Sequence, residues 1–150
     1  MNRLKLLSPA KVNLFLEVLG KRPDGYHEIE TVMQTVSLCD QLEFREIKTG
    51  IKVTSHHPNL PDGPRNLIYQ AAHLIKQRYQ IRQGINIFID KRIPIGAGLG
   101  GGSSNAATTL VGLNKLWKLG LPETELSCLA AQLGSDVPFF ISRLASASRP

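Results

Sequence analysis

Five glycines within fourteen residues constrain what this chain can fold into more than any other feature. The stretch from Pro94 to Ala107 reads PIGAGLGGGSSNAA and lies between an alternating apolar segment at 85–90 and a predicted helix from Ser103 to Leu119. Glycine reaches backbone angles that are closed to other residues, and successive backbone N–H groups in such a loop form a concave anion site. The first N–H groups of the helix lack internal partners, and the helix dipole favours negative charge there. The stretch therefore predicts a loop that binds a polyphosphate.

Two common glycine-loop templates fit this stretch poorly. A Walker A loop ends in Gly-Lys-Ser or Gly-Lys-Thr, and here no lysine precedes Ser103. The spacing of Gly96, Gly98 and Gly101 satisfies the dinucleotide pattern, but that fold also needs an acidic residue about 20 positions later at the end of a second strand. Glu123 has roughly this spacing and lies in a predicted helix instead. A flexible linker is a further alternative, but its place between a strand and an apolar-periodic helix argues against it.

The composition is that of one soluble globular domain. Of the 150 residues, 42% are apolar and 20% are charged, and 18 basic against 12 acidic residues give a net charge of +6. This charge is compatible with nucleic acid, a membrane surface or a phosphorylated small molecule, but the basic residues are scattered, so charge alone names no partner. The two cysteines are far apart, and no signal-peptide core or membrane-length apolar span is present. We therefore expect a cytoplasmic protein without a membrane or nucleic-acid partner.

Periodicity along the rest of the chain predicts an α+β fold. Helices are expected from Arg65 to about Gln80, from Ser103 to Leu119, and from Pro122 to just before Gly134. Within the second predicted strand, Lys11 and Asn13 point to one face, and the apolar positions Val12, Leu14, Leu16 and Val18 point to the other. The alternating segments that predict strands are 3–7, 11–19, 29–38, 41–47, 51–54 and 85–90.

The polar residues outside the glycine loop have ordinary structural interpretations when they are considered alone. Lys11 is typical of a solvated strand lysine, and Asn66 of a helix cap. The Pro23-Asp24-Gly25 sequence predicts a turn, and the tyrosine and histidine after it open the next strand. Asp136 is typical of a turn residue, because a helix has ended before it and the proline two residues later prevents another helix from continuing through it.

Four segments together resemble a known family. The pattern Pro-x-x-x-Gly-Leu-Gly-x-x-Ser-Ser-x-Ala at 94–106 resembles the ATP loop of the GHMP small-molecule kinases, named for galactokinase, homoserine kinase, mevalonate kinase and phosphomevalonate kinase. The segments SPAKVNL at 8–14, RPDGYHEI at 22–29 and GSDVPFF at 134–140 resemble one branch of that family. That branch uses ATP to phosphorylate the 2-hydroxyl of 4-diphosphocytidyl-2-C-methyl-D-erythritol in non-mevalonate isoprenoid, or terpenoid, biosynthesis. The four segments occur in family order between positions 8 and 141.

The resemblance implies a two-layer amino-terminal kinase domain, similar in layout to a ribosomal-protein domain, with ATP and Mg²⁺ as cofactors and a small molecule as substrate. It implies that Lys11 sits by the transferred phosphate and that Asp136 acts as general base. It also implies that Asn13 orients the substrate, while Tyr26 stacks on its cytosine and His27 bonds the base edge. Ser104 is a candidate metal or phosphate contact; the other Mg²⁺ ligands are not predicted. The residues expected to hold ATP are Asn66, Pro94, Ile95, Gly96, Ala97, Gly98, Leu99, Gly100, Gly101, Gly102, Ser103 and Ser104.

The resemblance stops after Ile141. Related kinases continue with a glycine-rich segment and a second domain, whereas residues 142–150 here are small, polar and basic, without helix or strand periodicity. We therefore expect an ATP-binding domain at 1–141 and an atypical tail at 142–150 of the kind that a truncation or a frame shift produces. Two alternatives to the kinase remain: a nucleotide-binding fragment without turnover, and a basic RNA-binding module, since the layout resembles that of a ribosomal-protein domain.

Overall fold

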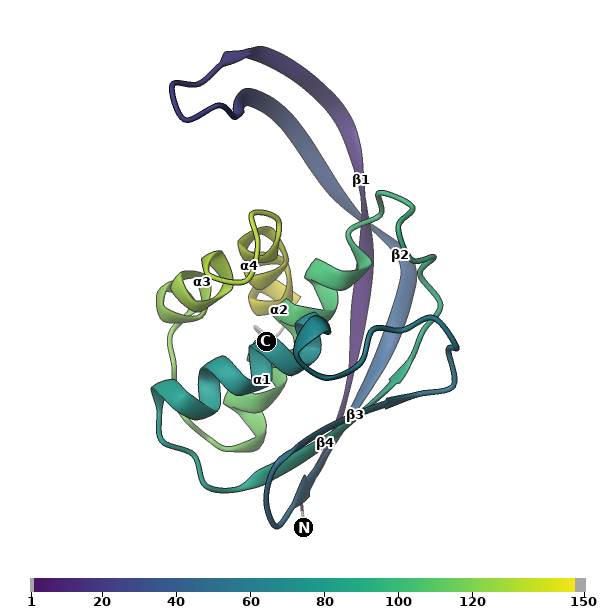
Figure 1. Cartoon of the computed structure of the whole chain (residues 1–150), viewed down its shortest axis with the longest axis vertical. Coiled ribbons are helices and arrows are strands. Elements are labelled where there is room, and N and C mark those ends of the chain that lie inside the picture. Colours follow the sequence, from purple (N-terminus) through teal and green to yellow (C-terminus); the bar gives the residue numbers. More distant parts are fainter. Residues whose placement is uncertain (1, 148–150) are drawn as a thin grey trace.

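The chain folds as one sheet with helices packed on one of its faces. The computed structural model describes residues 2–147, except for the side chains of Leu16 and Ile29. The described residues form a four-stranded sheet in the order β1-β2-β4-β3, which lies along one side of the molecule in Figure 1. This arrangement confirms the predicted α+β class. In chain order the elements are β1 (Arg3–Lys21), β2 (His27–Ile47), β3 (Ile51–Ser55), a 3₁₀ turn (Gly63–Arg65), α1 (Leu67–Arg78), β4 (Gly84–Asp90), α2 (Gly101–Leu116), α3 (Glu123–Ala131) and α4 (Val137–Ala147).

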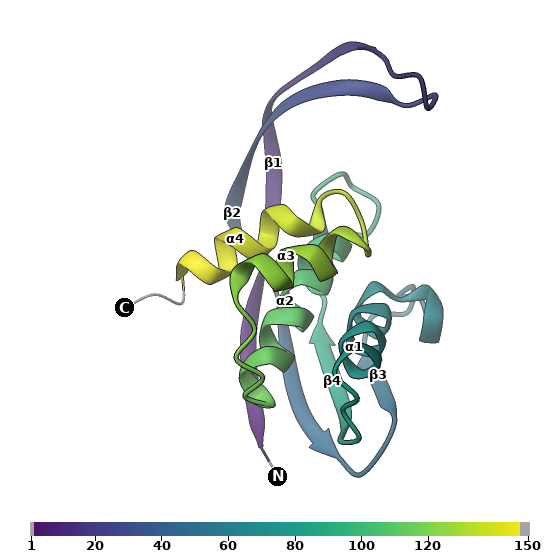
Figure 2. The same ribbon diagram turned by 90° about the vertical axis from the view of Figure 1, so that its left-hand side faces the viewer.

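The first two strands form a single long hairpin where four separate strands were predicted. Their antiparallel ladder runs from Arg3 opposite Arg45 to Lys21 opposite His27, and its register shifts between Pro9 and Lys11, between Asn13 and Phe15, and between Val18 and Gly20. The shift between Pro9 and Lys11 lies between the predicted strands 3–7 and 11–19, whereas the other two shifts lie in or at the end of the strand predicted at 11–19, whose alternation does not reveal them. Irregular register also bends strands, and Figures 1 and 2 show the hairpin arching beyond the helices.

We call residues 13–33 the outer hairpin. Val12, Leu14, Leu16 and Val18 were predicted to share one face of a strand, and of these Leu14 is 67% exposed and Val18 is 55% exposed. This part of the ladder extends beyond the helices (Figures 1 and 2), so the helices do not cover these two side chains. The predicted turn is present at the tip: Gly25 has a φ of +90°, and the Tyr26 N–H donates to the Asp24 carboxylate at 3.1 Å.

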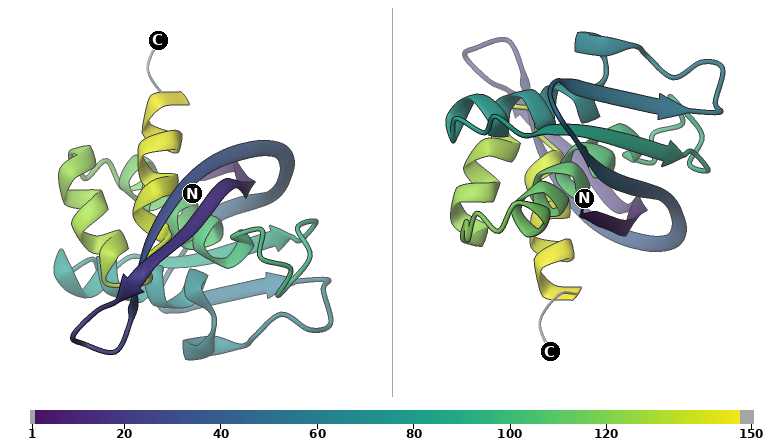
Figure 3. Two further views of the ribbon diagram at one scale, coloured as in Figure 1. Left: turned by 90° about the horizontal axis from the view of Figure 1, so that it is seen from above. Right: turned by 90° about the horizontal axis from the view of Figure 1, so that it is seen from below.

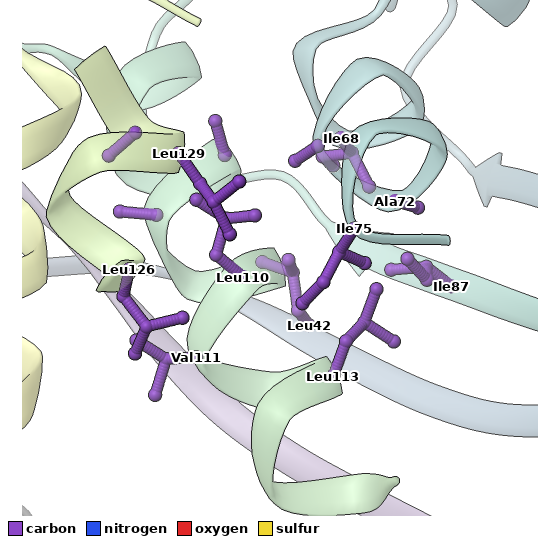
Figure 4. Close-up of a cluster of buried hydrophobic side chains, with 14 of the residues drawn as sticks. Leu42, Ile68, Ala72, Ile75, Ile87, Leu110, Val111, Leu113, Leu126 and Leu129 are labelled. Atoms are coloured by element: carbon purple, nitrogen blue, oxygen red, sulfur yellow. The ribbon is translucent and has the colours of Figure 1, made fainter. Parts of the chain in front are cut away.

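The core lies between the sheet and the helices (Figure 4). Parallel pairing of β3 with β4 and antiparallel pairing of β2 with β4 put Leu42 and Phe44 beside the buried isoleucines of β4. Every residue of α2 from Ser104 to Leu113 is buried, because this helix packs on the first two strands and lies among the other helices. Gly112 makes room for the Phe44 ring, since a Cβ on Gly112 would lie 2.6 Å from the Phe44 Cζ. Figure 3 shows from above and below how the helices gather on one side of the sheet.

Several helix boundaries differ from the predicted ones, and one helix was not predicted. α1 begins at Leu67 and not at Arg65, and α2 ends at Leu116 and not at Leu119. α2 begins at Gly101, two residues before the expected start, and Pro122 immediately precedes α3 instead of opening it. α4 was not predicted, because Pro138 was interpreted as a residue that stops a helix. Proline is tolerated in the first turn, where its missing N–H has no intrahelical partner to lose, and α4 begins at Val137. Residues 142–147 of the expected atypical tail are the last turns of α4, and 148–150 lie outside the described residues.

Candidate functional site

The glycine loop joins β4 to α2 and forms one wall of a pocket. Gly96, Gly98 and Gly100 have φ values of +71°, +75° and +69°, so each adopts the left-handed region that other residues rarely occupy. The pocket measures about 360 Å³ and lies where α2 begins, so the positive end of the helix dipole faces it. All of the predicted loop residues from Pro94 to Ser103 line it. The remaining lining residues are Leu60, Pro61, Arg65, Asn66, Leu67, Lys91 and Asn105.

Asn66 both caps α1 and lines the pocket. Its side-chain oxygen accepts a hydrogen bond from the Ile68 N–H at 2.8 Å, and its amide nitrogen donates to the Pro61 carbonyl at 2.9 Å. The structural interpretation from sequence is therefore confirmed, and the same residue stands across from the glycine loop. With both side-chain atoms engaged, Asn66 holds the 60–66 segment against α1 as part of the pocket wall.

Lys11 and Asp136 lie together at the end of the glycine loop, although 125 positions separate them. The Lys11 Nζ is 4.0 Å from an Asp136 carboxylate oxygen, and Lys11 is only 6% exposed. The Lys11 backbone N–H donates to the Leu99 carbonyl at 2.9 Å, which attaches the loop to β1. A Cβ on Gly100 would lie 2.9 Å from the Lys11 Cγ, so the glycine is needed for this close approach. Lys11 is thus a buried lysine paired with a carboxylate and not a solvated strand lysine.

Asp136 immediately precedes α4. The sequence pattern placed it in a loop that a proline keeps from being helical, and the structure corrects this context, because the next helix begins at Val137. Phe140, one turn into α4, approaches Gly100 on the same side as Lys11: a Cβ on Gly100 would also lie 3.1 Å from the Phe140 Cζ. α4 therefore fixes Asp136 relative to both the loop and Lys11.

A buried polar network lies behind the loop, and sequence reasoning found only part of it. Ser104 is fully buried, does not line the pocket, and shares a 2.9 Å hydrogen bond with Ser8. The Asn105 amide donates to Ser8 and to the Asp40 carboxylate, each at 2.9 Å. Lys91 closes the network with a 2.5 Å contact to Asp40. Asp40, Lys91 and Asn105 were missed, because no local pattern distinguishes them and only the fold brings them together.

Not all of the candidate substrate residues lie near the Lys11–Asp136 pair. Asn13 lies two residues after Lys11, and its side-chain oxygen accepts a hydrogen bond from the Thr31 hydroxyl at 3.1 Å. Tyr26 is 72% exposed at the hairpin tip, and His27 follows it. Lys21 pairs with His27 in the ladder, so about ten residues of strand, or roughly 30 Å, separate the histidine from Lys11 along β1.

Cys39 lies next to Asp40 in β2, beside the buried polar network. Burial, and to a lesser extent the neighbouring Asp40 charge, raises the pKa of the Cys39 thiol. This thiol therefore stays protonated beside the network at neutral pH. Among residues 2–147, no group of three or more histidine, cysteine, aspartate or glutamate side chains could hold a metal ion by itself. In the same part of the chain, no helix is long and apolar enough to cross a membrane.

Comparison with known proteins shows extensive similarity. The sequence profile of the GHMP kinases N terminal domain matches residues 66–143. A 4-diphosphocytidyl-2-C-methyl-D-erythritol kinase from Bacillus thuringiensis (strain Al Hakam) is 54% identical over 144 residues, which cover 94% of this chain and 49% of that protein. The protein of the same name from Bacillus cytotoxicus is 54% identical over 140 residues, covering 93% of this chain and 48% of that one.

Solved structures show the same relationship. A crystal structure of 4-(cytidine 5'-diphospho)-2C-methyl-D-erythritol kinase superimposes with a TM-score of 0.82 at 42% identity and covers 93% of this chain and 49% of that one. The mevalonate kinase of Methanococcus jannaschii shares the fold, with a TM-score of 0.67 at 20% identity over 88% of this chain and 46% of that one. The chain spans about half the length of the curated relatives that it matches. With its glycine loop, its fold and its profile match in agreement, this chain belongs to the GHMP kinase family.

Proposed function

We propose that this chain provides the ATP site and both catalytic side chains of a cytoplasmic kinase that phosphorylates the 2-hydroxyl of 4-diphosphocytidyl-2-C-methyl-D-erythritol. The observation that carries the proposal is the buried Lys11 beside Asp136 at the end of the glycine loop, 4.0 Å apart. A cation and a carboxylate held together at the end of a phosphate loop suit the transfer of a phosphoryl group to a hydroxyl. The curated relatives named for this reaction support the choice of substrate.

The two side chains divide the chemistry between them. The γ-phosphoryl group of ATP forms a bond to the substrate oxygen as its bond to ADP breaks, and the hydroxyl proton goes to Asp136. The Lys11 ammonium offsets charge on the phosphoryl oxygens. General base catalysis contributes about 10²- to 10⁴-fold, or roughly 3 to 5 kcal/mol of the barrier. Because such transfers have loose transition states, alignment of the hydroxyl is the larger part of the role of Asp136.

The glycine loop holds the triphosphate through backbone N–H groups and the start of α2. Mg²⁺ is usually held by one or two carboxylates together with phosphate oxygens and waters. The pocket lining contains no carboxylate, and among residues 2–147 no protein cluster could hold the ion alone, so the phosphate oxygens of ATP would supply most of its ligands. Ser103, which lines the pocket, is a better hydroxyl donor to the ion than the buried Ser104. The ion would neutralise phosphate charge.

The outer hairpin is proposed to recognise the cytidine end of the substrate. Tyr26 offers an exposed ring for stacking, and His27 offers a ring nitrogen to the base edge. Asn13, next to the catalytic pair in the strand, orients the erythritol end. Since the oxygen of Asn13 already accepts from Thr31, its NH₂ group is the donor available to the substrate.

The test is ATP consumption by the 150-residue chain with and without the cytidine diphosphate substrate, beside Asp136→Ala. Substrate-dependent consumption should fall by about 10²-fold or more in the variant. A chain that retains ATP but turns over no faster than Asp136→Ala would defeat the kinase proposal. That result would favour the second candidate, a nucleotide-binding unit without turnover.

A further inference from the structure

The Asp40 carboxylate, on β2, is completely buried and accepts four hydrogen bonds. One oxygen accepts from the backbone N–H groups of Arg92 and Ile93, at 2.6 and 2.7 Å. The other accepts from the Lys91 ammonium at 2.5 Å and from the Asn105 amide at 2.9 Å. A carboxylate has about four acceptor positions, so Asp40 uses its full capacity on the segment that leads into the glycine loop and on the first turns of α2.

Lys91 lines the pocket but directs its charge away from it. Its side chain is only 4% exposed, and its ammonium is bonded to Asp40 and, at 3.3 Å, to the Asn105 oxygen. A Cβ on Gly101 would lie 2.8 Å from the Lys91 Nζ, so the ammonium sits against the first residue of α2. A cation is unfavourable at that end of a helix, and the Asp40 charge offsets it. The Lys91 ammonium is therefore held by Asp40 and Asn105 and is not available to bind a phosphate.

The same network reaches the strand that carries Lys11. Asn105 donates its second amide hydrogen to Ser8, three residues before Lys11, and Ser8 also bonds Ser104. Asp40 thus connects the start of the loop, the start of α2 and β1 through hydrogen-bonded side chains that are all buried. A shift of the loop start or of α2 would break a bond to the buried Asp40 charge, and a shift of β1 would break the buried bonds of Ser8; each is costly because these groups cannot bond to water instead.

We propose that Asp40 is the positioning residue of the nucleotide site. It acts through Lys91, Asn105 and two backbone N–H groups, fixes where the glycine loop begins relative to α2, and makes Lys91 a buried cross-link instead of a phosphate ligand. The identity of the ligand rests on the function proposed above; the loop-fixing role does not.

The experiment compares Asp40→Asn with a matched control, Asp90→Asn. Asp90 also binds this segment, accepting from the Arg92 guanidinium at 2.8 Å, but at the exposed surface. Two quantities are measured on the full chain: amide hydrogen exchange at Arg92 and Ile93, and the dissociation constant of ATP in MgCl₂. Asp40→Asn should speed the exchange and weaken ATP binding by roughly ten-fold or more each, whereas Asp90→Asn should change both by less than about two-fold.

Lys91→Met and the double variant Asp40→Asn/Lys91→Met separate a cross-link from a phosphate ligand. Lys91→Met alone leaves the Asp40 charge buried without its cation and should weaken ATP binding by roughly ten-fold or more. In the double variant no buried charge is left unpaired, but the bonds of Asp40 to the loop are still weakened, so ATP affinity should be higher than that of Lys91→Met and lower than that of the original chain. A phosphate-binding lysine predicts the opposite, a double variant at least as weak as Lys91→Met. This pair also carries the test if Asp40→Asn does not fold.

Each outcome has a distinct meaning. Unchanged exchange at Arg92 and Ile93 in Asp40→Asn would overturn the positioning role, and so would unchanged ATP affinity in a variant whose loop exchanges faster. A double variant without recovery would overturn the cross-link. If the original chain does not bind ATP but Asp40→Asn still accelerates exchange at these two amides, the proposed function fails while the loop-fixing role stands.

Discussion

The two ends of the β1–β2 ladder are built differently. At the inner end Leu42 and Phe44 are completely buried under the helices, whereas in the outer hairpin Leu14 and Val18 are exposed. The glycine loop, Lys11 and Asp136 belong to the inner end, where each is held by contacts within the chain. The difference teaches that the proposed nucleotide side is preorganised by the core, while the proposed cytidine side depends little on it. Substitutions at the two ends should therefore change different quantities.

The largest expected effect comes from removing the same side chain at each end. Phe44→Ala leaves a cavity against Gly112 and should lower the free energy of unfolding by about 3–5 kcal/mol. Phe15→Ala, in the outer hairpin and 46% exposed, should change it by no more than about 0.5 kcal/mol. Urea denaturation of both variants measures the difference. Similar losses in the two variants would show that the outer hairpin is as firmly packed as the core and would contradict the difference between the two ends.

Two glycines of the loop test whether the inner end depends on close contact with Lys11. Gly98→Ala and Gly100→Ala each put a side chain at a positive φ, which costs about 1–2 kcal/mol. Only the alanine at position 100 also collides with Lys11, since no atom lies within 4 Å of a Cβ on Gly98. We expect Gly100→Ala to lower the rate of ADP formation in a turnover assay by about 10²-fold more than Gly98→Ala does, because the collision moves Lys11. Equal rates for the two variants would show that the contact with Lys11 does not matter.

A smaller effect is expected at the base of the outer hairpin. The Thr31 hydroxyl bonds both the Asn13 side chain and the Phe15 carbonyl. Thr31→Val keeps the shape and removes these bonds, so the KM for the cytidine substrate should rise by roughly 2- to 12-fold while the affinity for ATP stays constant. Thr54→Val, the same substitution at an exposed position of β3, is the control. A parallel loss of ATP affinity would mean that the two ends are coupled.

An effect of about the same small size is expected in the helical layer, away from both ends. The Tyr79 hydroxyl donates to Glu125 at 2.7 Å and joins the end of α1 to α3. Burial, and then the hydrogen bond and charge of Glu125, raises the pKa of the Tyr79 phenol above its ordinary value of 10.0. The contribution to stability is therefore complete below about pH 10 and is lost as the pH rises through the folded-state pKa.

The measurement is denaturant unfolding of Tyr79→Phe from pH 7 to 11. The variant should lose about 0.5–1.5 kcal/mol at pH 7 and should show a shallower decline at alkaline pH than the original chain. An identical alkaline decline in both proteins would assign it to other groups.

Local chemistry explains what the sequence could predict. The glycine loop, the turn at 23–25 and the Asn66 cap depend on residues close together in the chain, and each is present as predicted. The Lys11–Asp136 pair followed from family resemblance, because neither residue alone differs from an ordinary strand lysine or turn aspartate.

The missed features depend on long-range contacts or on exceptions to a local rule. Asp40 lies at the break between two predicted strands, because aspartate is rare in strands, yet the ladder runs through it. Its four donors come from residues more than 50 positions away, which no local pattern reveals. The start of α4 was missed because proline stops a helix in its interior but not in its first turn.

The strand order also has a consequence for the order in which the chain folds. β1 with β2 is one hairpin, β3, α1 and β4 form a second unit within residues 51–90, and the ladder between Gln41–Ile47 and Gly84–Asp90 joins the two into one sheet. The hairpin can form outward from its turn at 23–26, whereas the joining ladder has no local turn to start from and pairs residues as far apart as Gln41 and Asp90. We expect it to form in the rate-limiting transition state, and Leu42→Ala, which weakens it, should slow refolding more than it speeds unfolding in stopped-flow experiments. Asp40 lies directly before Gln41, the first residue of that ladder on β2. The nucleotide pocket is then completed in the same folding step as the core.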